Sequence, residues 1–503
     1  MSSYFPSFNY LGINSREQGL VVVHFDADQG EVDTFLGMEP VYSENAYGSR
    51  RLDYGAKYNN VANFRITMIK PDGNDLSVAE VRKHLRWLTG AKQNSPLELT
   101  KHFIEEFISD GAKVFKLTNT CDHVFQVYVD NTLLATDKWS YDKTTNSITF
   151  TSAQIRGSTI KISYNQIKCY FIGRITNAWQ YKMDSRTVGL IFEFTSISPW
   201  AYSSKQVTSA FVGDGTEVIV NNDTDDLYGY TCANVIFNSV KNNMLKNTYT
   251  LKTVNFSMDN SSNVGSTIPR GMCDEDEYNG FHVVCNNANL RWWPGSPQIV
   301  PGRSYTMSIQ YKINSGSAPI QFQYIFRDAS NATVSYYDST SLGVATVYEK
   351  DGWMVLVSTF TVPNNSSITN VNVAVRTGSD NTAYTCDYNV RRPKLEQGNK
   401  ATIWTPHVDD PGFDSLQITN NNTNETTLIT NIAVNETITM SDNMMITSDN
   451  SSKIFGNTFN FVFPRLAAGE NNFIVTGYGN LTFEYVYAIK IGDCAMDIIE
   501  ELN

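Results

Sequence analysis

The chain has 503 residues and a formal net charge of −12; 12% of its residues are aromatic and 18% are charged. A chain of this length exceeds what one hydrophobic core organises, so we expect several domains. The net negative charge argues against a nucleic-acid clamp, because such a clamp needs a basic surface to displace counterions from phosphates. No apolar run is long enough to span a bilayer, and the opening residues MSSYFPSF lack a secretory pattern, so neither membrane insertion nor a secretory signal is expected.

Strands separated by turns are predicted for the N-terminal segment, with one helix among them. GLVVVHFDAD (Gly19–Asp28) and NVANFRITMIKP (Asn60–Pro71) alternate apolar and polar side chains and are bounded by turn residues. A helix is predicted between Ser77 and Gly90, because Ser77 and Glu80 are spaced as a capping box and Gly90 supplies a stop. Apolar residues recur there at helical spacing: Val78, Val81, Leu85 and Leu88.

Two blocks interrupt the chain. From about Gly111 to Tyr164, short strands joined by turns predict a compact β module. The segments before and after this module resemble each other in their residue patterns. A longer β-rich block from Leu245 to Thr405 interrupts a second sheet in the same way. The polar stretch RRPKLEQGNKATIWTP (Arg391–Pro406) marks its exit. Both blocks are therefore interpreted as insertions, which exposed loops accept with few broken contacts.

Three segments of the longer block alternate so that one face of each strand is apolar. These faces are Tyr305, Met307, Ile309, Tyr311 and Ile313 in the first, Ile320, Phe322, Tyr324 and Phe326 in the second, and Val371, Val373 and Val375 in the third. Such strands at short spacing predict a two-sheet sandwich or jelly roll.

The seven cysteines are scattered and none forms a CxxC pair, so neither a zinc knuckle nor a redox motif is predicted. We interpret them as reduced thiols, with a Cys273–Cys285 disulfide as the alternative. The acidic run CDEDEY (Cys273–Tyr278) also has two interpretations: a solvated loop, or oxygen ligands for calcium.

The order of these segments resembles that of the distal tail protein of long-tailed bacteriophages. In the N-terminal half the resemblance rests on FNYLGINSREQGLVVVHFDAD, RRLDYGAKYNNVANFRITMIKP, the helix ending in WLTG, and YFIGRITN before SPWAYSS. Near the end, SLQITNNN and KIFGNTFNFVFPRLAAGENNFIVTG resemble the galectin-like sandwich of that family. PGRSYTMSIQYK, DGWMVLVSTFTVP and RPKLEQGNKATIWTP resemble the closing half of carbohydrate-binding jelly rolls inserted into this scaffold, whereas MCDEDEYNGFHVVC departs from their pattern.

The resemblance implies a mainly β chain with one notable helix. Its parts are an N-terminal belt domain, a C-terminal galectin-like β-sandwich, an inserted jelly-roll carbohydrate-binding module and a small inserted β module. The implied division is 1–110 and 166–205 for the belt domain, 111–165 for the small module, 206–244 and 406–503 for the galectin-like domain, and 245–405 for the jelly roll.

The implied function is that of a structural hub at the tail tip. Six copies form a ring that joins the tail tube to the adhesion device, and the inserted module binds host cell-wall saccharides. The implied partners are further copies of the chain, the tail tube protein, a lysin-like tail-tip hub protein, the receptor-binding protein and host wall polysaccharide. DNA passes through the channel without specific binding. The implied location is the tail tip or baseplate of the virion, after assembly in the host cytoplasm.

Sugar binding needs flat aromatic faces for the sugar ring, and amides, carboxylates or guanidiniums for its hydroxyls. Carbohydrate contacts are predicted among Trp292, Trp293, Tyr324, Arg327 and Tyr337. Because neighbouring strand residues point to opposite faces, at most one of Trp292 and Trp293 serves a given face, and the same holds for Tyr336 and Tyr337. Plain packing is the competing interpretation for each. We expect Trp353 in the core and Trp404 at the domain seam.

Related modules place a structural calcium ligand near their last strand, so Asp387 is the predicted metal ligand and calcium the one cofactor considered. No HExxH, GxSxG or P-loop pattern is present, so neither an enzyme nor a catalytic residue is predicted. Two rival functions stay open. One is a tail-associated polysaccharide-degrading enzyme, whose carboxylate pair sequence spacing does not reveal. The other is a structural spacer without glycan binding.

Overall fold

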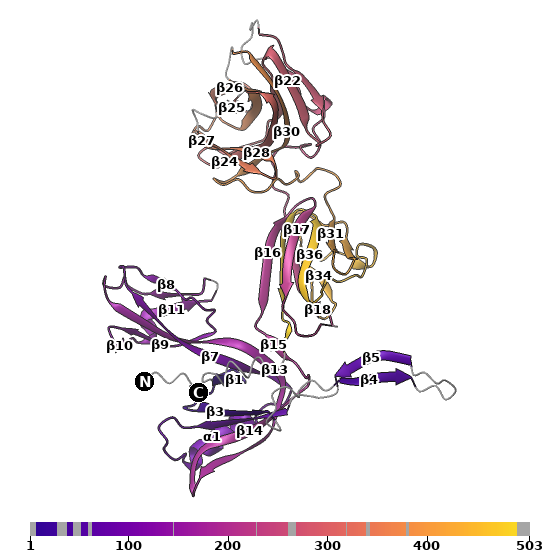
Figure 1. The fold of residues 1–503 in the computed structure, drawn as a ribbon. Coiled ribbons are helices and arrows are strands. Elements are labelled where there is room, and N and C mark those ends of the chain that lie inside the picture. Colours follow the sequence, from indigo (N-terminus) through magenta and orange to yellow (C-terminus); the bar gives the residue numbers. More distant parts are fainter. Residues whose placement is uncertain are drawn as a thin grey trace.

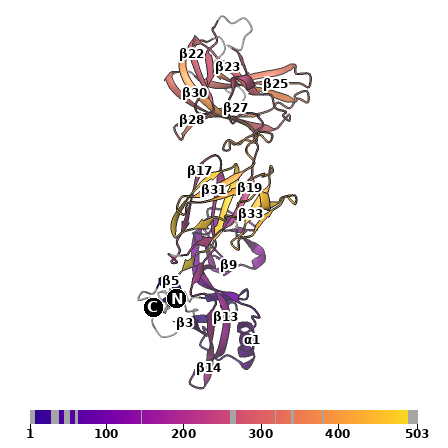
Figure 2. The same ribbon diagram turned by 90° about the vertical axis from the view of Figure 1, so that its right-hand side faces the viewer.

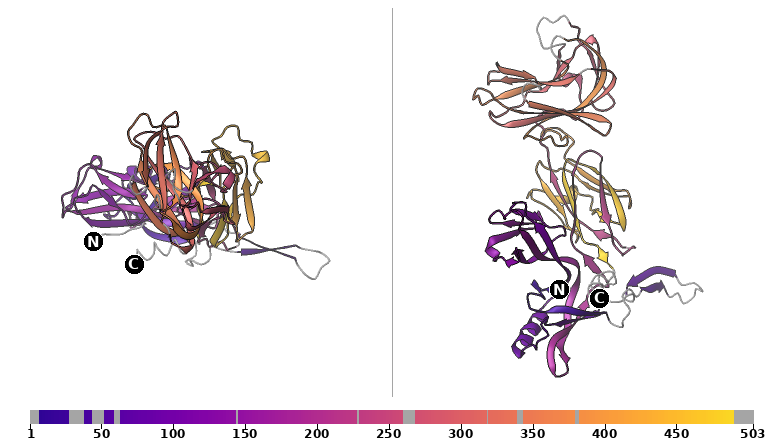
Figure 3. Two further views of the ribbon diagram at one scale, coloured as in Figure 1. Left: turned by 90° about the horizontal axis from the view of Figure 1, so that it is seen from above. Right: turned by 60° about the vertical axis from the view of Figure 1, so that its left-hand side comes forward.

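The computed structural model describes residues 7–27, 38–43, 52–58, 63–143, 145–227, 229–259, 268–317, 319–338, 343–378 and 382–489. Figures 1, 2 and 3 show an elongated molecule in which three β-rich bodies follow one another. We name them the belt part (strands within 7–203 and 488–489), the host sandwich (strands within 206–239 and 416–485) and the inserted sandwich (strands within 257–397). Within the described residues α1 (Val78–Leu88) is the single α-helix, which confirms the mainly β prediction. No helix in that part of the chain is both long and apolar enough to cross a membrane.

A sheet of eleven described strands organises the belt part. They are β1 (Ser7–Tyr10), β2 (Ile13–Asn14), β3 (Val21–Ala27), β6 (Asn63–Ile69), β7 (Ser95–Ile108), β9 (His123–Val129), β10 (Thr132–Leu133), β13 (Thr159–Met183), β14 (Arg186–Ser196), β15 (Ala201–Ser203) and β38 (Ala488–Ile489). The main order is β2-β1-β7-β13-β14-β6-β3, and β9 and β15 also pair with β13. Because β38 pairs with β15, the chain returns to its first sheet after building the other two bodies. A separate hairpin, β4 (Met38–Ser43) and β5 (Leu52–Tyr58), extends away from the belt part (Figure 1).

The predicted helix is confirmed, but Val78 does not lie on its buried face. Ser77 is the N-cap: its hydroxyl accepts the Glu80 amide proton at 3.2 Å, and the Glu80 carboxylate accepts the Ser77 amide proton at 2.7 Å. The buried residues of α1 are Val81, His84, Trp87 and Leu88. Val78 is exposed rather than buried, because the buried face is centred on His84 and Trp87.

The small module predicted for residues 111–165 has its own sheet but shares long strands with the belt part. β8 (Val114–Lys116), β11 (Trp139–Asp142) and β12 (Ser147–Phe150) pair in the order β11-β12-β8, after the short 3-10 helix η2 (Thr136–Lys138). β13 places Ile160 and Ile162 in the module's core, and Phe171 and Ile175 in the belt core. The module is therefore an outgrowth of continuous strands, because a single strand buries side chains in both cores. The boundaries at 110 and 165 remain a proposal.

His102 on β7 makes this region sensitive to acid. Its side chain is buried, its Nε2 lies 3.3 Å from Ser163 Oγ, and burial, followed by the charge of Arg16, lowers its pKa from 6.5 to about 4. Between these values the unfolded chain binds a proton that the folded chain does not, so stability falls as the pH falls from 6.5 towards 4. At 1.36 kcal/mol per unit, the full loss is about 3 kcal/mol.

We expect calorimetric unfolding of the belt part to show that loss in the wild type and to show a much smaller one in His102→Gln. The amide of the variant keeps a hydrogen-bonding group beside Ser163 but does not titrate. Equal losses in the two proteins would contradict the assignment.

Segments on both sides of the longer block build the host sandwich. Its strands are β16 (Gln206–Val212), β17 (Thr216–Asn222), β18 (Thr231–Cys232), β19 (Asn234–Ser239), β31 (Leu416–Asn420), β32 (Glu425–Ile429), β33 (Thr437–Met440), β34 (Ile446–Ser448), β35 (Arg465–Leu466), β36 (Gly469–Thr476) and β37 (Gly479–Tyr485), with the 3-10 helix η4 (Phe455–Asn457). The sheets run β16-β37-β19-β33-β34 and β17-β36-β31-β32, and β18 pairs with β35. From this pairing we propose 206–244 and 406–503 as one domain; residues 490–503 lie outside the described residues.

The inserted sandwich has two sheets of its own. Its strands are β20 (Ser257–Asp259), β21 (Met272–Glu275), β22 (Phe281–Ala288), β23 (Arg291–Gly295), β24 (Ser304–Gly316), β25 (Ile320–Arg327), β26 (Thr333–Asp338), β27 (Gly343–Lys350), β28 (Trp353–Thr361), β29 (Asn370–Thr377) and β30 (Tyr384–Gln397), after the 3-10 helix η3 (Thr253–Asn255). The five-stranded sheet runs β20-β23-β29-β25-β26 and the six-stranded sheet β21-β22-β30-β24-β28-β27. The three predicted apolar faces all line the core between them, apart from Ile313, which lies in the exposed end of β24.

Polar contacts fasten the chain where it leaves and re-enters the host sandwich. The Thr405 hydroxyl donates to Asn242 Oδ1 at 2.6 Å. Lys394 Nζ donates to the Thr402 hydroxyl at 2.6 Å and lies 3.1 Å from Glu396 Oε2. The Glu396 carboxylate also accepts the Thr402 amide at 2.7 Å and the Asn242 side-chain amide at 3.2 Å. The polar stretch Arg391–Pro406 thus consists of the end of β30 and the loop that follows it. This loop folds back over the buried ion pair of Lys394 and Glu396.

Candidate functional site

Alternation decides which predicted residues reach an outer face of the inserted sandwich. β23 turns Trp292 into the core, where it is 0% exposed, and turns Trp293 outward. β26 packs Tyr337 against the core, whereas Tyr336 on the opposite side of the strand is 42% exposed. In each pair, one aromatic side chain therefore faces the core and the other faces outward, as the sequence predicts.

Burial corrects two of the predicted carbohydrate contacts. Trp292 makes edge contacts with Phe281 and Phe256, at ring distances of 5.3 and 5.8 Å. Tyr324 lies 4.2 Å from Phe360 between ring centroids and has no exposed surface. A sugar cannot reach either side chain, so both belong to the packing of the sandwich.

The outer face of the five-stranded sheet carries an aromatic and polar cluster, which we name the Trp293 face: Arg291, Trp293, Gln323, Tyr336 and Arg376. The Arg291 guanidinium lies 4.8 Å from the Trp293 ring centre and donates to Gln323 Oε1 at 2.8 Å. Gln323 in turn donates to the Tyr336 hydroxyl. Arg291, Gln323 and Arg376 are buried, so these contacts fix the two aromatic side chains that remain accessible, Trp293 in part and Tyr336. Accessible aromatic rings are the groups that the apolar side of a sugar ring requires.

Of the two remaining predicted contacts, Arg327 lies at the margin of this face, whereas Tyr337 lies on the core side of the sheet. Arg327 ends β25, and its Nη1 donates to the Asn331 carbonyl at 3.1 Å and to the Thr333 hydroxyl at 2.9 Å. Tyr337 is partly buried, with its ring 5.9 Å from that of Phe326. The structure therefore brings Trp293 and Arg327 to the same side of the sheet but leaves Tyr337 on the core side.

Asp387 lies on the outer face of the six-stranded sheet among nitrogen donors. Its Oδ1 lies 2.7 Å from His282 Nε2 and accepts a hydrogen bond from Asn314 at 2.8 Å. Burial raises its pKa, but the hydrogen bonds from Asn314 and His282 together outweigh burial and lower it. Among the described residues no three His, Cys, Asp or Glu side chains gather as a metal site. The acidic loop uses Asp276 internally, because its carboxylate accepts the Tyr278 amide at 2.9 Å.

The alternative Cys273–Cys285 disulfide is wrong, because both thiols are free. Cys273 is opposite Val283, whereas Cys285 is opposite Cys386 on β30. Burial raises the pKa of Cys273 to about 12, which keeps it a thiol at neutral pH. The other cysteines in the described residues form no disulfide either, and Cys494 lies outside the described residues.

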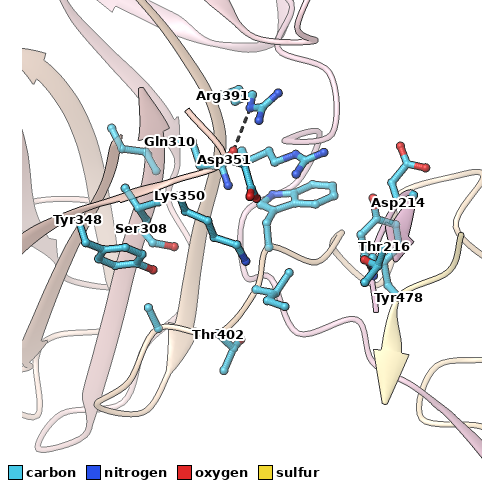
Figure 4. A pocket seen from close by; sticks show the side chains of 18 of the residues that line it. Asp214, Thr216, Ser308, Gln310, Tyr348, Lys350, Asp351, Arg391, Thr402 and Tyr478 are labelled. Carbon is cyan, nitrogen blue, oxygen red and sulfur yellow. Dashed lines mark hydrogen bonds between the residues drawn. The ribbon is translucent and has the colours of Figure 1, made fainter. Parts of the chain in front are cut away.

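A cavity of about 460 Å³ lies between the inserted sandwich and the host sandwich (Figure 4). The outer face of the six-stranded sheet forms one wall with Gln310, Tyr348 and Lys350. Asp214 in the loop between β16 and β17 and Thr216 at the start of β17 form the other. No sequence pattern predicted this cavity, because its walls come from separate bodies of the fold.

The floor of the cavity is the domain seam, where Trp404 was expected. The Trp404 ring contacts the Tyr478 ring at 5.4 Å and the Phe413 ring at 6.2 Å, and its Nε1 donates to the Thr248 hydroxyl at 3.2 Å. Rings of the two segments that connect the sandwiches therefore pack against Tyr478 of the host sandwich at the seam.

Trp353 is buried as expected but faces outward from the six-stranded sheet rather than into the core. The Arg391 guanidinium covers it at 3.9 Å and donates through Nε to Gln310 at 2.9 Å. Burial, followed by repulsion from Arg392, lowers the pKa of Arg391 to about 10, so it remains charged at neutral pH. Trp353 thus serves as a platform that positions a cavity-lining cation.

Two family models match the ends of the chain. Residues 3–122 match the model described as a phage tail protein N-terminal domain, and residues 408–485 match the model described as a phage tail C-terminal domain. A search of the curated proteins found no match.

Solved structures show likenesses of fold at low identity. The Dit protein of phage SPP1, described as a paradigm of the hub adsorption apparatus in phages that infect Gram-positive bacteria, is 7% identical over 96% of this chain and 99% of its own, with a TM-score of 0.30. The tripod from the baseplate of bacteriophage Tuc2009 is 15% identical over 51% of this chain and 78% of its own, with a TM-score of 0.24. The CBM22-1 xylan-binding domain from Paenibacillus barcinonensis is 12% identical over 33% and 99%, with a TM-score of 0.21.

Proposed function

We propose that this chain, whose residues 3–122 and 408–485 match models of a phage tail N-terminal and a phage tail C-terminal domain, is a structural hub of the tail tip that also binds saccharides. One observation carries the proposal. In the sequence, the strands of the host sandwich lie on both sides of an inserted sandwich. On the Trp293 face of that sandwich, Tyr336 is exposed and Trp293 is partly exposed. One polypeptide thus joins a tail scaffold to a surface with sugar-binding chemistry.

In the proposed assembly the belt parts of six copies form a closed ring. Large apolar side chains remain exposed on the belt part of the single chain, and such side chains favour burial against another protein. They include Ile108, Val114, Leu133, Ile155, Met183 and Ile197. Contacts between unlike surfaces of neighbouring copies close into a ring when the rotation fits. An obligate interface of this kind is large and apolar.

The ring would sit between the tail tube protein and the lysin-like tail-tip hub protein, with the receptor-binding protein as a further neighbour. Genomic DNA would cross its channel without specific binding. The net charge of −12 supports this, because an acidic surface repels phosphates. The protein would act in the virion, at the tail tip, after assembly in the host cytoplasm.

The Trp293 face would bind a host wall saccharide reversibly. A sugar ring would stack on Trp293 or Tyr336, and Arg327 at the margin would reach its hydroxyls. Six such faces on one ring would bind a repetitive polymer more tightly than a single face does. Once one face is bound, the effective concentration of polymer at the other faces is high, so no new kind of contact is needed.

Retention of the purified full chain on immobilised wall polysaccharides from a panel of bacterial strains tests this function. We expect retention of the wild type, and about tenfold weaker binding for Trp293→Ala, which corresponds to the loss of one aromatic contact of about 1.4 kcal/mol. Tyr230→Ala removes an exposed aromatic side chain of the host sandwich and should bind like the wild type.

The same incubation separates the rival functions. Release of reducing ends or acetate from the polysaccharide would identify an enzyme. Failure of the wild type to bind every polysaccharide of the panel would identify a structural spacer.

A further inference from the structure

We propose that the cavity between the two sandwiches is a second saccharide site, which takes an uncharged oligosaccharide and clamps the inserted sandwich to the host sandwich. The site differs from the Trp293 face. It uses the opposite sheet of the inserted sandwich, and it has a wall from the host sandwich (Figure 4).

The cavity has the size and lining of a ligand site. Its volume of about 460 Å³ falls within the roughly 300–1,000 Å³ of typical small-ligand pockets. Tyr348 on β27 offers an aromatic ring that is 48% exposed, which suits the apolar side of a sugar ring. The hydroxyl-bearing residues Thr216, Ser308 and Thr402 also line it.

Several of its polar groups are fixed before any ligand arrives. Arg391 is held by the Trp353 ring at 3.9 Å and by Gln310 at 2.9 Å. The Thr216 hydroxyl accepts the Gly213 amide at 2.8 Å, which shapes the loop of the host wall. A site whose groups are already ordered loses less conformational entropy when it binds.

The balance of charge identifies the ligand class. The cavity is lined by three cationic and three acidic side chains: Lys350, Arg391 and Arg392, with Asp214, Glu217 and Asp351. An anion would meet the carboxylates and a cation would meet the guanidiniums. A sugar hydroxyl both donates and accepts hydrogen bonds, so an uncharged polyol can pair with groups of either sign.

A ligand that touches both walls would couple the two bodies. The acidic groups Asp214 and Glu217 belong to the host sandwich, whereas the cations belong to the inserted sandwich. Binding would therefore fix the orientation of the inserted sandwich on the host sandwich. It would require the full chain rather than the inserted sandwich alone.

The test uses the full chain with Trp293→Ala and Tyr336→Ala, which removes the aromatic groups of the Trp293 face. Calorimetric titration with xylohexaose, mannohexaose, cellohexaose and chitohexaose should show one site per chain for at least one of these sugars. Asp214→Ala on the host wall and Lys350→Ala on the inserted wall should each weaken that binding about tenfold. Lys312→Ala, an exposed lysine of β24 that does not line the cavity, should leave it unchanged.

Hydrogen exchange gives a second readout. Bound sugar should protect the amides of residues 213–217 and of β27 together. Absence of binding by all four sugars, or binding that is indifferent to Asp214→Ala, would overturn the proposal. Neither result bears on the Trp293 face, which is tested by wild-type retention on polysaccharide and its loss in Trp293→Ala.

Discussion

Replacement of Lys394 by methionine should destabilise the inserted sandwich by about 3–5 kcal/mol, the usual cost of leaving one partner of a buried ion pair without its counter-charge. The side chains of Lys394 and Glu396 are 0% and 4% exposed. Burial lowers the pKa of Lys394, and the Glu396 carboxylate partly restores it, so the two charges depend on each other. Hydrogen exchange resolved to peptides of β24 and β30 measures the change where it occurs.

Two variants make this prediction specific. Lys394→Met combined with Glu396→Gln should recover part of the loss, because the second change removes the stranded charge. Lys246→Met breaks an exposed ion pair with Asp409 at the same junction and should cost at most about 1 kcal/mol. Similar losses for Lys394→Met and Lys246→Met would show that the buried pair has no special role.

Trp292→Ala should destabilise the inserted sandwich by about 3–5 kcal/mol, because it removes a fully buried indole and leaves a cavity. The neighbouring Trp293→Ala should change stability far less while weakening polysaccharide binding. The measurement is again hydrogen exchange of the inserted sandwich, with retention on polysaccharide measured in parallel.

Comparing the stabilities of Trp292→Ala and Trp293→Ala also tests the outward position of Trp293. If Trp293→Ala lowered stability as much as Trp292→Ala, the outward position of Trp293 would be wrong. The Trp293 face would then lose its main aromatic group.

Local patterns predicted much of this fold, because alternation and capping are short-range. The capping box of Ser77 and Glu80 is formed as expected, and the β25 face from Ile320 to Phe326 lines the core. The same alternation separates Trp292 from Trp293. It could also have selected Tyr336 over Tyr337 once the direction of the core was known.

Long-range pairing accounts for what sequence reasoning missed. Gln323 joins Arg291 to Tyr336 only because β23, β29, β25 and β26 are neighbours in one sheet. Cys285 meets Cys386 because β22 pairs with β30, a register that spacing does not reveal. Sequence reasoning also missed that the small module shares β13 with the belt part. No local pattern marks the point where this strand leaves one core and enters the other.

Electron microscopy of the purified full chain tests the central claim, a ring-forming hub that carries sugar-binding arms. We expect six-fold rings around an open channel, with the host and inserted sandwiches projecting as paired knobs from the belt. Single elongated particles without rings, at concentrations where the belt surfaces should associate, would contradict it.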